Sequence, residues 1–441
     1  MRGIPSWVIR RDRGGRPSKI LYIGSLTRKI TSERPLIIST GVELKRITSD
    51  GDNSFSIFES AYRPFFILAT VSSLYYMALW MAFYTFKLRL NFEDMSTTMW
   101  HAHKMLFGYT IAVIAGFSLT IEKYRFGAVL SKKSALLLLI TLWILARLFI
   151  SLTLITDISW KTGAVFDCLF ILILAFRVSY PIVRGMDREK TGLAAHLALM
   201  AVSNVVFYLG VLGILPDGRR LGVYSALFLV VSTILLMGRM MIPLFIRNGL
   251  EFKFEPRNWK PIDTASVVFF VAFFILELFF ASGKLVSIIA GILALIYSVR
   301  LYGWHSRWIW NKPMLWVLFI AYAWIAIGFG LKFLSLYLNI PNLPALHSFT
   351  YGGIGMMTIG FMSRVTLGHT GRNVFTPPRI VFWIFTILFA GAIVRVFFPL
   401  ILSGSYHLWI AISQALWILS FLIFAVVFLP MLWNPRMEAR A

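Results

Sequence analysis

The sequence predicts an all-α integral membrane protein, a polytopic bundle of about twelve transmembrane helices with both termini in the cytoplasm. Of its 441 residues 58% are hydrophobic and the mean hydropathy is +0.76, which is too apolar for a soluble protein. Apolar segments of about 20 residues, the length that spans a bilayer, recur with short connections between them. Basic residues concentrate in alternate connections, as they do in multi-pass membrane proteins.

The apolar segments predict the spans one by one. Because hydrocarbon offers no hydrogen-bond partners, each segment must satisfy its own backbone, which favours helices throughout. The predicted spans are Pro64–Phe86, His101–Ile121, Ser134–Leu154, Gly163–Val183, Gly192–Leu215, Leu221–Ile246, Ile262–Ala281, Gly283–Tyr302, Pro313–Leu334, Leu343–Val365, Pro378–Leu402 and Tyr406–Trp433.

The charge pattern sets the expected orientation. The chain carries 43 basic and 19 acidic residues, a formal net charge of +24. A basic excess can indicate nucleic-acid binding, but here the basic residues lie between apolar runs, so we expect no nucleic-acid partner. One set of connections holds nineteen cations and the opposite set holds only seven: Lys87, Arg89, Lys161, Arg219, Arg220, Lys284 and Lys332. The richer side, which includes both termini, is predicted to be cytoplasmic.

The chain divides into three parts. Residues 1–60 are polar and basic, and they predict a disordered cytoplasmic arm. The alternative is an over-called translation start, since no methionine lies between Met1 and Met77. Residues 61–436 form a single transmembrane domain, and residues 437–441 a cytoplasmic tail. No apolar core follows the first basic residues, so no cleavable signal peptide is predicted.

Histidines are the candidate metal ligands. Cys168 is the single cysteine, which excludes an internal disulfide, a thiolate cluster and a CxxCH haem attachment. With the predicted orientation, His101, His103, His347 and His407 gather at the outer face of the bundle. His196, His305 and His369 fall at the inner face. Four imidazoles at one face favour a bound metal or haem, because imidazole suits iron and copper; hydrogen-bonded packing histidines are the alternative.

The stretch from Pro344 to Arg372 combines histidines with glycines. His347 and His369 lie 22 residues apart, or about 33 Å along a helix, so two separate sites are predicted. Each interior glycine costs a helix roughly 1 kcal/mol relative to alanine. We therefore expect the glycines to admit another helix or a flat cofactor close to the backbone. They are Gly352, Gly353, Gly355 and Gly360.

The pair His101 and His103 has a different geometry. Residues two apart point to opposite sides of a helix, so the two rings are expected to serve different sites unless the helix start is unwound. Ser96, or a threonine directly after it, is predicted to cap this helix. Nearby thioethers favour Cu(I), although core packing is the commoner role of methionine. They belong to Met95, Met99, Met105, Met356 and Met357.

Arginines also fall within or beside the predicted spans. The acids inside the spans are few, Asp167 and Glu277, too few to neutralise these arginines. An anionic cofactor such as haem, with its two propionates, would neutralise them, whereas snorkelling to lipid headgroups is the alternative. The arginines concerned are Arg63, Arg147, Arg239, Arg364 and Arg395.

Several functions are disfavoured by what the sequence lacks. There is no Walker loop, GxSxG or HExxH motif, and the shortage of buried acids argues against a proton- or sodium-coupled pump. The alternative to a haem protein is a cofactor-free twelve-helix transporter or channel for a small anion. The segments around His101 and His347 show no mutual similarity that would indicate an internal repeat, which counts against a transporter.

The motifs taken together resemble the NnrS family of bacterial inner-membrane proteins, and the likeness extends from about Phe58 to Trp433. It rests on the following segments in this order: YRPFF from Tyr62, WHAHKMLFGYTIAVIAGF from Trp100, LW from Leu142 with Arg147, GR from Gly238, IPLF from Ile242, and ALHSFTYGGIGMMTIGFMSRVTLGHTGR from Ala345.

The resemblance implies a haem protein, with b-type haem and with copper as a further expected metal. The resemblance further implies that this protein acts in the response to nitric oxide and to nitrosative stress, with nitric oxide or iron–nitrosyl species as its partners. The resemblance also implies roles for individual residues. His101, His103, His347 and His369 become the expected haem or metal ligands. The expected propionate or anion partners are Arg63, Arg147, Arg239, Arg364 and Arg372.

This chain departs from the family pattern at two places. Lys104 stands where the family has an acid after the HAH triplet, and a cation beside His103 opposes a metal ion there. Copper binding is therefore expected to be weaker, while haem binding remains. Tyr208, four residues after Asn204, stands where the family has a histidine; a phenol oxygen can ligate ferric haem, but a structural role is the alternative.

The charge pattern makes a testable prediction about topology. Alkaline phosphatase, which is active only outside the cytoplasm, should be inactive when fused after Met437 or within residues 251–258. The same enzyme fused within residues 216–220 should be active, because that connection is predicted to lie outside. Activity of the fusion after Met437 would contradict the orientation.

Overall fold

The described part of the chain is helical throughout. The computed structural model describes residues 56–89, 95–126, 133–156, 158–183, 191–280 and 283–437, which form helices and connecting turns without a strand. Most of the predicted N-terminal arm, residues 1–55, and residues 438–441 of the predicted tail lie outside the described residues.

Eleven described helical segments are long and apolar enough to cross a membrane. A twelfth run, Leu343 to His369, is also continuous but changes helix type along its length. The all-α multi-pass fold is thus confirmed. The helices are α1 (Tyr62–Tyr84), α2 (Thr97–His103), η2 (Lys104–Thr110), α3 (Ile111–Phe126), α4 (Lys133–Leu152), α5 (Trp160–Val183), α6 (Thr191–Val211), α7 (Gly218–Gly249), α8 (Lys260–Phe279), α9 (Lys284–Trp304), α10 (Pro313–Tyr337), α11 (Leu343–His347), η5 (Ser348–Gly355), α12 (Met356–His369), α13 (Ile380–Val396), α14 (Phe398–Ile401) and α15 (Tyr406–Trp433).

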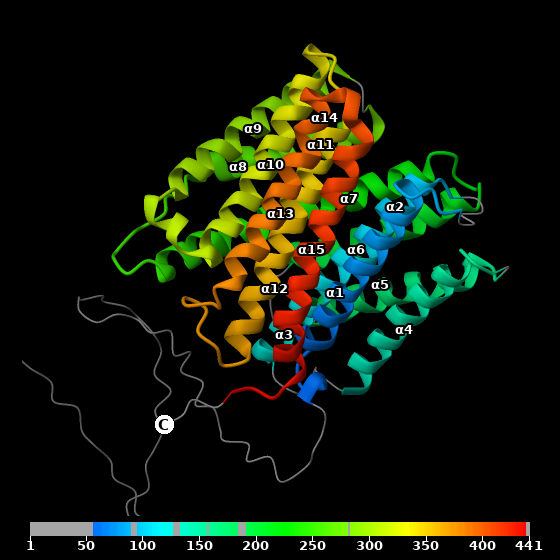
Figure 1. Ribbon diagram of the computed structural model, residues 1–441, viewed down its shortest axis with the longest axis horizontal. Helices are drawn as coiled ribbons and strands as arrows, with labels where there is room; N and C mark the ends of the chain where they lie inside the picture. Colours follow the sequence, from blue (N-terminus) through cyan, green and yellow to red (C-terminus); the bar gives the residue numbers. More distant parts are fainter. Residues whose placement is uncertain are drawn as a thin grey trace, which may run out of the picture. The chain divides into compact units, whose positions relative to one another are not determined.

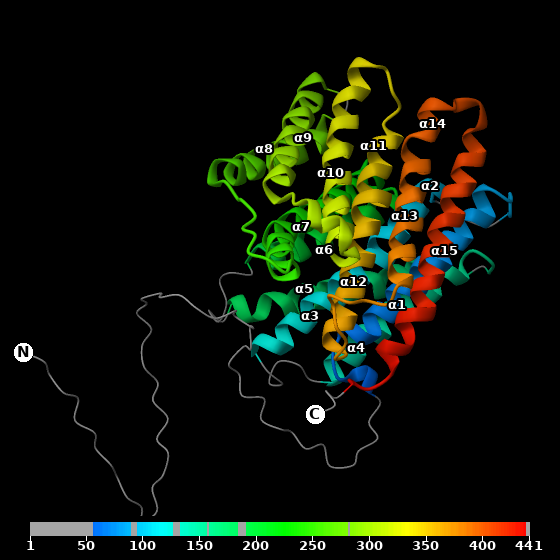
Figure 2. The same cartoon turned by 60° about the vertical axis from the view of Figure 1, so that its left-hand side comes forward.

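The packing contacts divide the spans into three successive groups of four, and Figures 1 and 2 show α1 of the first group beside α15 of the last. The third and fourth spans of each group pack together, as α4 with α5, α8 with α9 and α13 with α15. The first span of each group packs on the last span of another, as α6 on α5, α10 on α9 and α1 on α15. Through these contacts the first helix of the chain packs along the last.

The second span of each group packs closely on the first at a glycine. In the first group a Cβ on Gly108 would lie 3.1 Å from the ring of Tyr76 in α1, and in the second a Cβ on Gly222 would overlap the backbone of Phe207 in α6. In the third group, a Cβ on Gly352 would overlap the indole of Trp324 in α10. The glycines of the Pro344–Arg372 stretch therefore admit side chains from neighbouring helices: Trp324, Ile325 and Trp417 over Gly352, Gly353 and Gly355, and Val317 with Leu318 over Gly360.

The second spans of the first and third groups each contain a π-helical segment between two α-helices. α2 ends at His103 and continues as the π-helix η2 before α3, while α11 ends at His347 and continues as the π-helix η5 before α12. In both runs a glycine follows five residues after this histidine, and a Gly-Phe pair follows later; the two phenylalanines, Phe117 and Phe361, pack edge to face. The expectation that the two segments have no mutual counterpart is therefore wrong, because the likeness lies in helix geometry and glycine spacing.

The close packing at Gly352 yields a prediction for stability. Gly352→Ala should destabilise the protein by roughly 1–3 kcal/mol, since the new methyl group overlaps a fully buried indole. Gly330→Ala on α10 is the control, because its methyl group would meet only Ala294 at 3.9 Å, and it should be neutral or stabilising. Thermal unfolding in detergent measures both; equal effects would contradict the packing argument.

Candidate functional site

A cavity of about 220 Å³ lies where the second spans of the three groups meet. α2 with η2, α7, and α11 with η5 supply most of its lining, and α1 and α15 each add one residue. The walls are mainly apolar, with Leu106, Leu227, Leu346 and Ile354 among them. Such a largely apolar pocket with a few polar groups is typical of small-molecule and cofactor sites.

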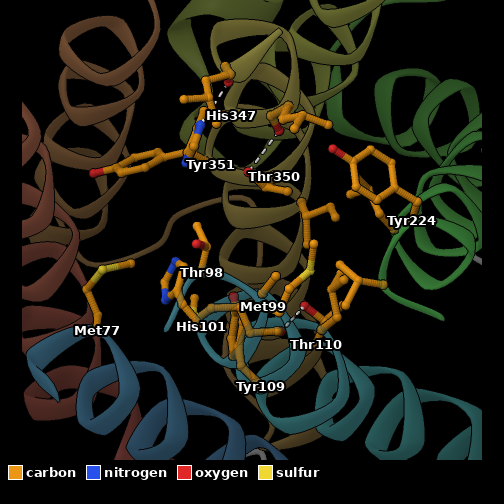
Figure 3. Close-up of a pocket in the computed structure, with 18 of the residues that line it drawn as sticks. Met77, Thr98, Met99, His101, Tyr109, Thr110, Tyr224, His347, Thr350 and Tyr351 are labelled. Carbon is orange, nitrogen blue, oxygen red and sulfur yellow. Dashed lines mark hydrogen bonds between the residues drawn. The ribbon is translucent and has the colours of Figure 1, made fainter. Parts of the chain in front are cut away.

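Two of the predicted ligands, His101 and His347, line this cavity from opposite sides (Figure 3). His101 lies on α2 and its ring stacks on Trp80 of α1, with centroids 4.5 Å apart and planes 14° from parallel. Its Nδ1 atom is buried and finds no hydrogen-bond partner among the described residues, as is also true of Nε1 of Trp324 and Nε2 of Gln414. It is therefore the place of the His101 ring in the cavity wall that makes this residue a candidate ligand.

The ring of His347 has both nitrogens engaged. Nδ1 lies 2.8 Å from the carbonyl oxygen of Leu343, one turn earlier, and Nε2 lies 2.8 Å from a guanidinium nitrogen of Arg395 on α13. Arg395 stands behind His347 and is not part of the cavity lining. Arg395, which the sequence analysis noted only for its position within a predicted span, thus has His347 as its partner.

Two tyrosine hydroxyls and several methionine thioethers are further polar or polarisable groups of the cavity, and both hydroxyls are hydrogen-bonded to other parts of the protein. The hydroxyl of Tyr109 bonds Thr358, and that of Tyr351 donates to the carbonyl of Ser413 at 2.8 Å. The cavity also takes in soft sulfur ligands, which belong to Met77, Met99 and Met105. Tyr224 of α7 and three threonines are the other polar residues of the lining: Thr98, Thr110 and Thr350.

His103 faces away from the cavity, as two-residue spacing on a regular helix requires. Ser96 caps α2 by accepting a hydrogen bond from the Met99 amide, so the predicted cap is confirmed. The ring of His103 is fully buried; its Nε2 lies 2.9 Å from Oδ1 of Asn204, and its Nδ1 lies 3.4 Å from Nζ of Lys104.

Beside His103 lies a buried ion pair. Asp167 on α5 pairs with Arg147 on α4 and accepts a 2.9 Å hydrogen bond from Tyr208. Arg147 also donates to the carbonyl oxygen of Phe107 in η2, so it links α4 to the π-helical segment. The acid that neutralises Arg147 is thus present within the protein, and Tyr208 belongs to this network.

The remaining histidines are dispersed. His369 at the end of α12 packs on Tyr62, with ring centroids 5.3 Å apart, and does not line the cavity of His347. His196 has both nitrogens bonded, to the Gly192 carbonyl and to Ser232. His305 packs beside Trp310 and His407 beside Tyr84. Of the four histidines expected at the outer face, the cavity brings together two.

The predicted anion-binding arginines lie outside the cavity lining as well. Arg63 is buried and donates to the carbonyls of Leu432 and Asn434, at the end of α15. Arg239 pairs with Asp263, and Arg364 stacks on Phe245 with its carbon 3.7 Å from the ring centroid. One buried guanidinium nitrogen of Arg364, and one of Arg372, has no hydrogen-bond partner among the described residues.

The residues of the cavity fit a haem better than a metal ion held by protein alone. Among the described residues no three His, Cys, Asp or Glu side chains come close enough to hold a metal ion. A haem iron takes four ligands from its own porphyrin and needs only one or two from the protein. One imidazole with an unpartnered nitrogen in an apolar cavity meets that need.

The buried ion pair yields a second stability prediction. Asp167→Asn should cost about 3–5 kcal/mol, because it leaves the Arg147 guanidinium without a counter-charge inside the bundle. Glu251→Gln is the control; its pair with Lys312 is at the surface, where ion pairs contribute about 0–1 kcal/mol. Unfolding temperatures in detergent compare the two, and a smaller loss for Asp167→Asn than for Glu251→Gln would refute the assignment.

Comparison with known proteins agrees with the motifs. No curated protein matches the chain. A protein-family model, described as NnrS protein, matches residues 56–436, which covers every described membrane span. The resemblance seen in the sequence is thereby confirmed, and the chain belongs to the NnrS family, multi-pass membrane proteins of the nitric oxide response.

Proposed function

We propose that this protein binds haem in the cavity between α2, α7 and η5 and acts there in resistance to nitrosative stress, in the bacterial inner membrane. The observation that supports this most directly is that two imidazoles, those of His101 and His347, lie in the wall of one apolar cavity. When bound, ferrous haem would supply a centre with affinity for nitric oxide.

The chain contributes binding, orientation and exclusion of water. Stacking on Trp80 fixes the plane of the His101 ring before any ligand arrives. The leucine and isoleucine walls keep the cavity apolar, which favours a small uncharged ligand over solvated ions. Met77, Met99 and Met105 offer thioethers, so copper in the Cu(I) state is a further metal for the same cavity.

A transporter for a small anion is the second candidate, favoured by the repeated arrangement of the spans in three groups. The cavity lining includes no arginine or lysine, so a small anion, like the propionates of a haem, would find no counter-charge within it. Uptake of nitrate or nitrite by proteoliposomes of haem-free protein would favour this candidate over the haem protein.

Optical and metal analysis tests the haem proposal. Protein expressed with sufficient haem should show a Soret band and contain iron, and His101→Ala/His347→Ala should lose both. His196→Ala is the control and should keep them, because His196 is bonded to Gly192 and Ser232 away from the cavity. Wild-type protein without a Soret band and without iron would rule the proposal out.

A further inference from the structure

The two cavity histidines are not equivalent, and the difference begins with His347. A guanidinium has only donors, so the Arg395 nitrogen must donate to Nε2 of His347 across their 2.8 Å contact. The lone pair of this imidazole is therefore in use, and Nδ1 carries the proton that is donated to the Leu343 carbonyl. A metal requires that same lone pair, so His347 cannot coordinate while Arg395 holds it.

His103, the residue of the first group that matches His347 in position, is engaged in the same way. Its Nε2 donates to Oδ1 of Asn204 at 2.9 Å, and its Nδ1 faces the Lys104 ammonium at 3.4 Å. His103 and His347 each directly precede a π-helix. Each has one ring nitrogen that donates to an oxygen and another that faces a cationic side chain, Lys104 or Arg395.

His101 does not follow this pattern, because it lies three residues before the π-helix and not directly before it. Its Nδ1 is buried without a partner among the described residues, and its ring is fixed by the indole of Trp80. Figure 3 shows His101 and His347 on opposite sides of the cavity. Of the two imidazoles in the lining, His101 is the one that offers a nitrogen to a ligand.

We propose that His101 is the single protein ligand of the iron, and that Arg395 is a positioning residue that keeps His347 out of coordination. This assignment rests on the haem-binding function proposed above. A haem iron with one imidazole ligand retains a coordination position for an exogenous diatomic ligand, whereas two imidazoles would occupy both positions. The contact between Arg395 and His347 thus decides whether nitric oxide has access to the metal.

Titration of the detergent-solubilised full chain with ferric haem tests the assignment. His101→Ala should weaken haem binding by roughly a hundredfold, since even groups one layer behind the ligand change metal affinity 10–100-fold. His347→Ala should bind haem within about threefold of wild type. Added imidazole should restore haem binding to the His101→Ala variant, a response that a purely structural role of His101 would not give.

The role of Arg395 has its own test. Arg395→Leu frees Nε2 of His347, so the ferric spectrum should shift toward the six-coordinate, two-imidazole form, and the affinity of the ferrous complex for carbon monoxide should fall. Arg395→Lys keeps a cationic donor and should retain the wild-type spectrum, and Arg395→Leu/His347→Ala should regain it. An unchanged Arg395→Leu spectrum would overturn the role given to Arg395.

Failure of the assignment can be told apart from failure of the haem proposal. If wild-type protein takes up haem but His347→Ala loses it while His101→Ala does not, the assignment of His101 as the ligand is wrong and the haem proposal stands. If wild-type protein takes up no haem, both the proposed function and the assignment are wrong.

Discussion

Every polar group that this chain places within the bilayer must find its partner inside the protein, because hydrocarbon supplies none. This constraint explains the positions of the buried charges. Arg147 meets Asp167, Lys332 meets Glu277, and Arg300 meets Asp263 and Tyr322, each pair joining two different helices. Nδ1 of His101 is among the buried atoms that have no such partner in the described residues, and it is the one whose residue lines the cavity together with a second histidine.

The sequence predicted the fold well because membrane spans are local. Hydropathy over about 20 residues and the spacing of prolines, glycines and basic residues locate each span without knowledge of its neighbours. The segment from Leu343 was also found as a span, although two changes of helix type divide it in the structure. Helix type is decided by tertiary contacts such as Trp324 over Gly352, and the pattern of apolar residues does not record them.

The candidate site was predictable only in part. Periodicity correctly separated His101 from His103, because opposite faces of a helix follow from the spacing alone. Depth placed His347 at the outer end of its span but could not show that Arg395, 48 positions later, bonds its ring. The count of acids likewise suggested that the arginines lacked counter-charges, yet Asp167 and Asp263 each reach one or two arginines from a different helix. Partner choice across helices depends on packing, which a single sequence does not contain.

The hydrogen bonds of Arg63 have a consequence for how the molecule is made. This residue lies at the start of the first described span, yet the carbonyls that it binds, those of Leu432 and Asn434, belong to the end of the twelfth. Ten further spans are therefore synthesised before these hydrogen bonds can form. A nascent chain of this protein joins its first and twelfth spans through Arg63 only after the other spans have entered the membrane.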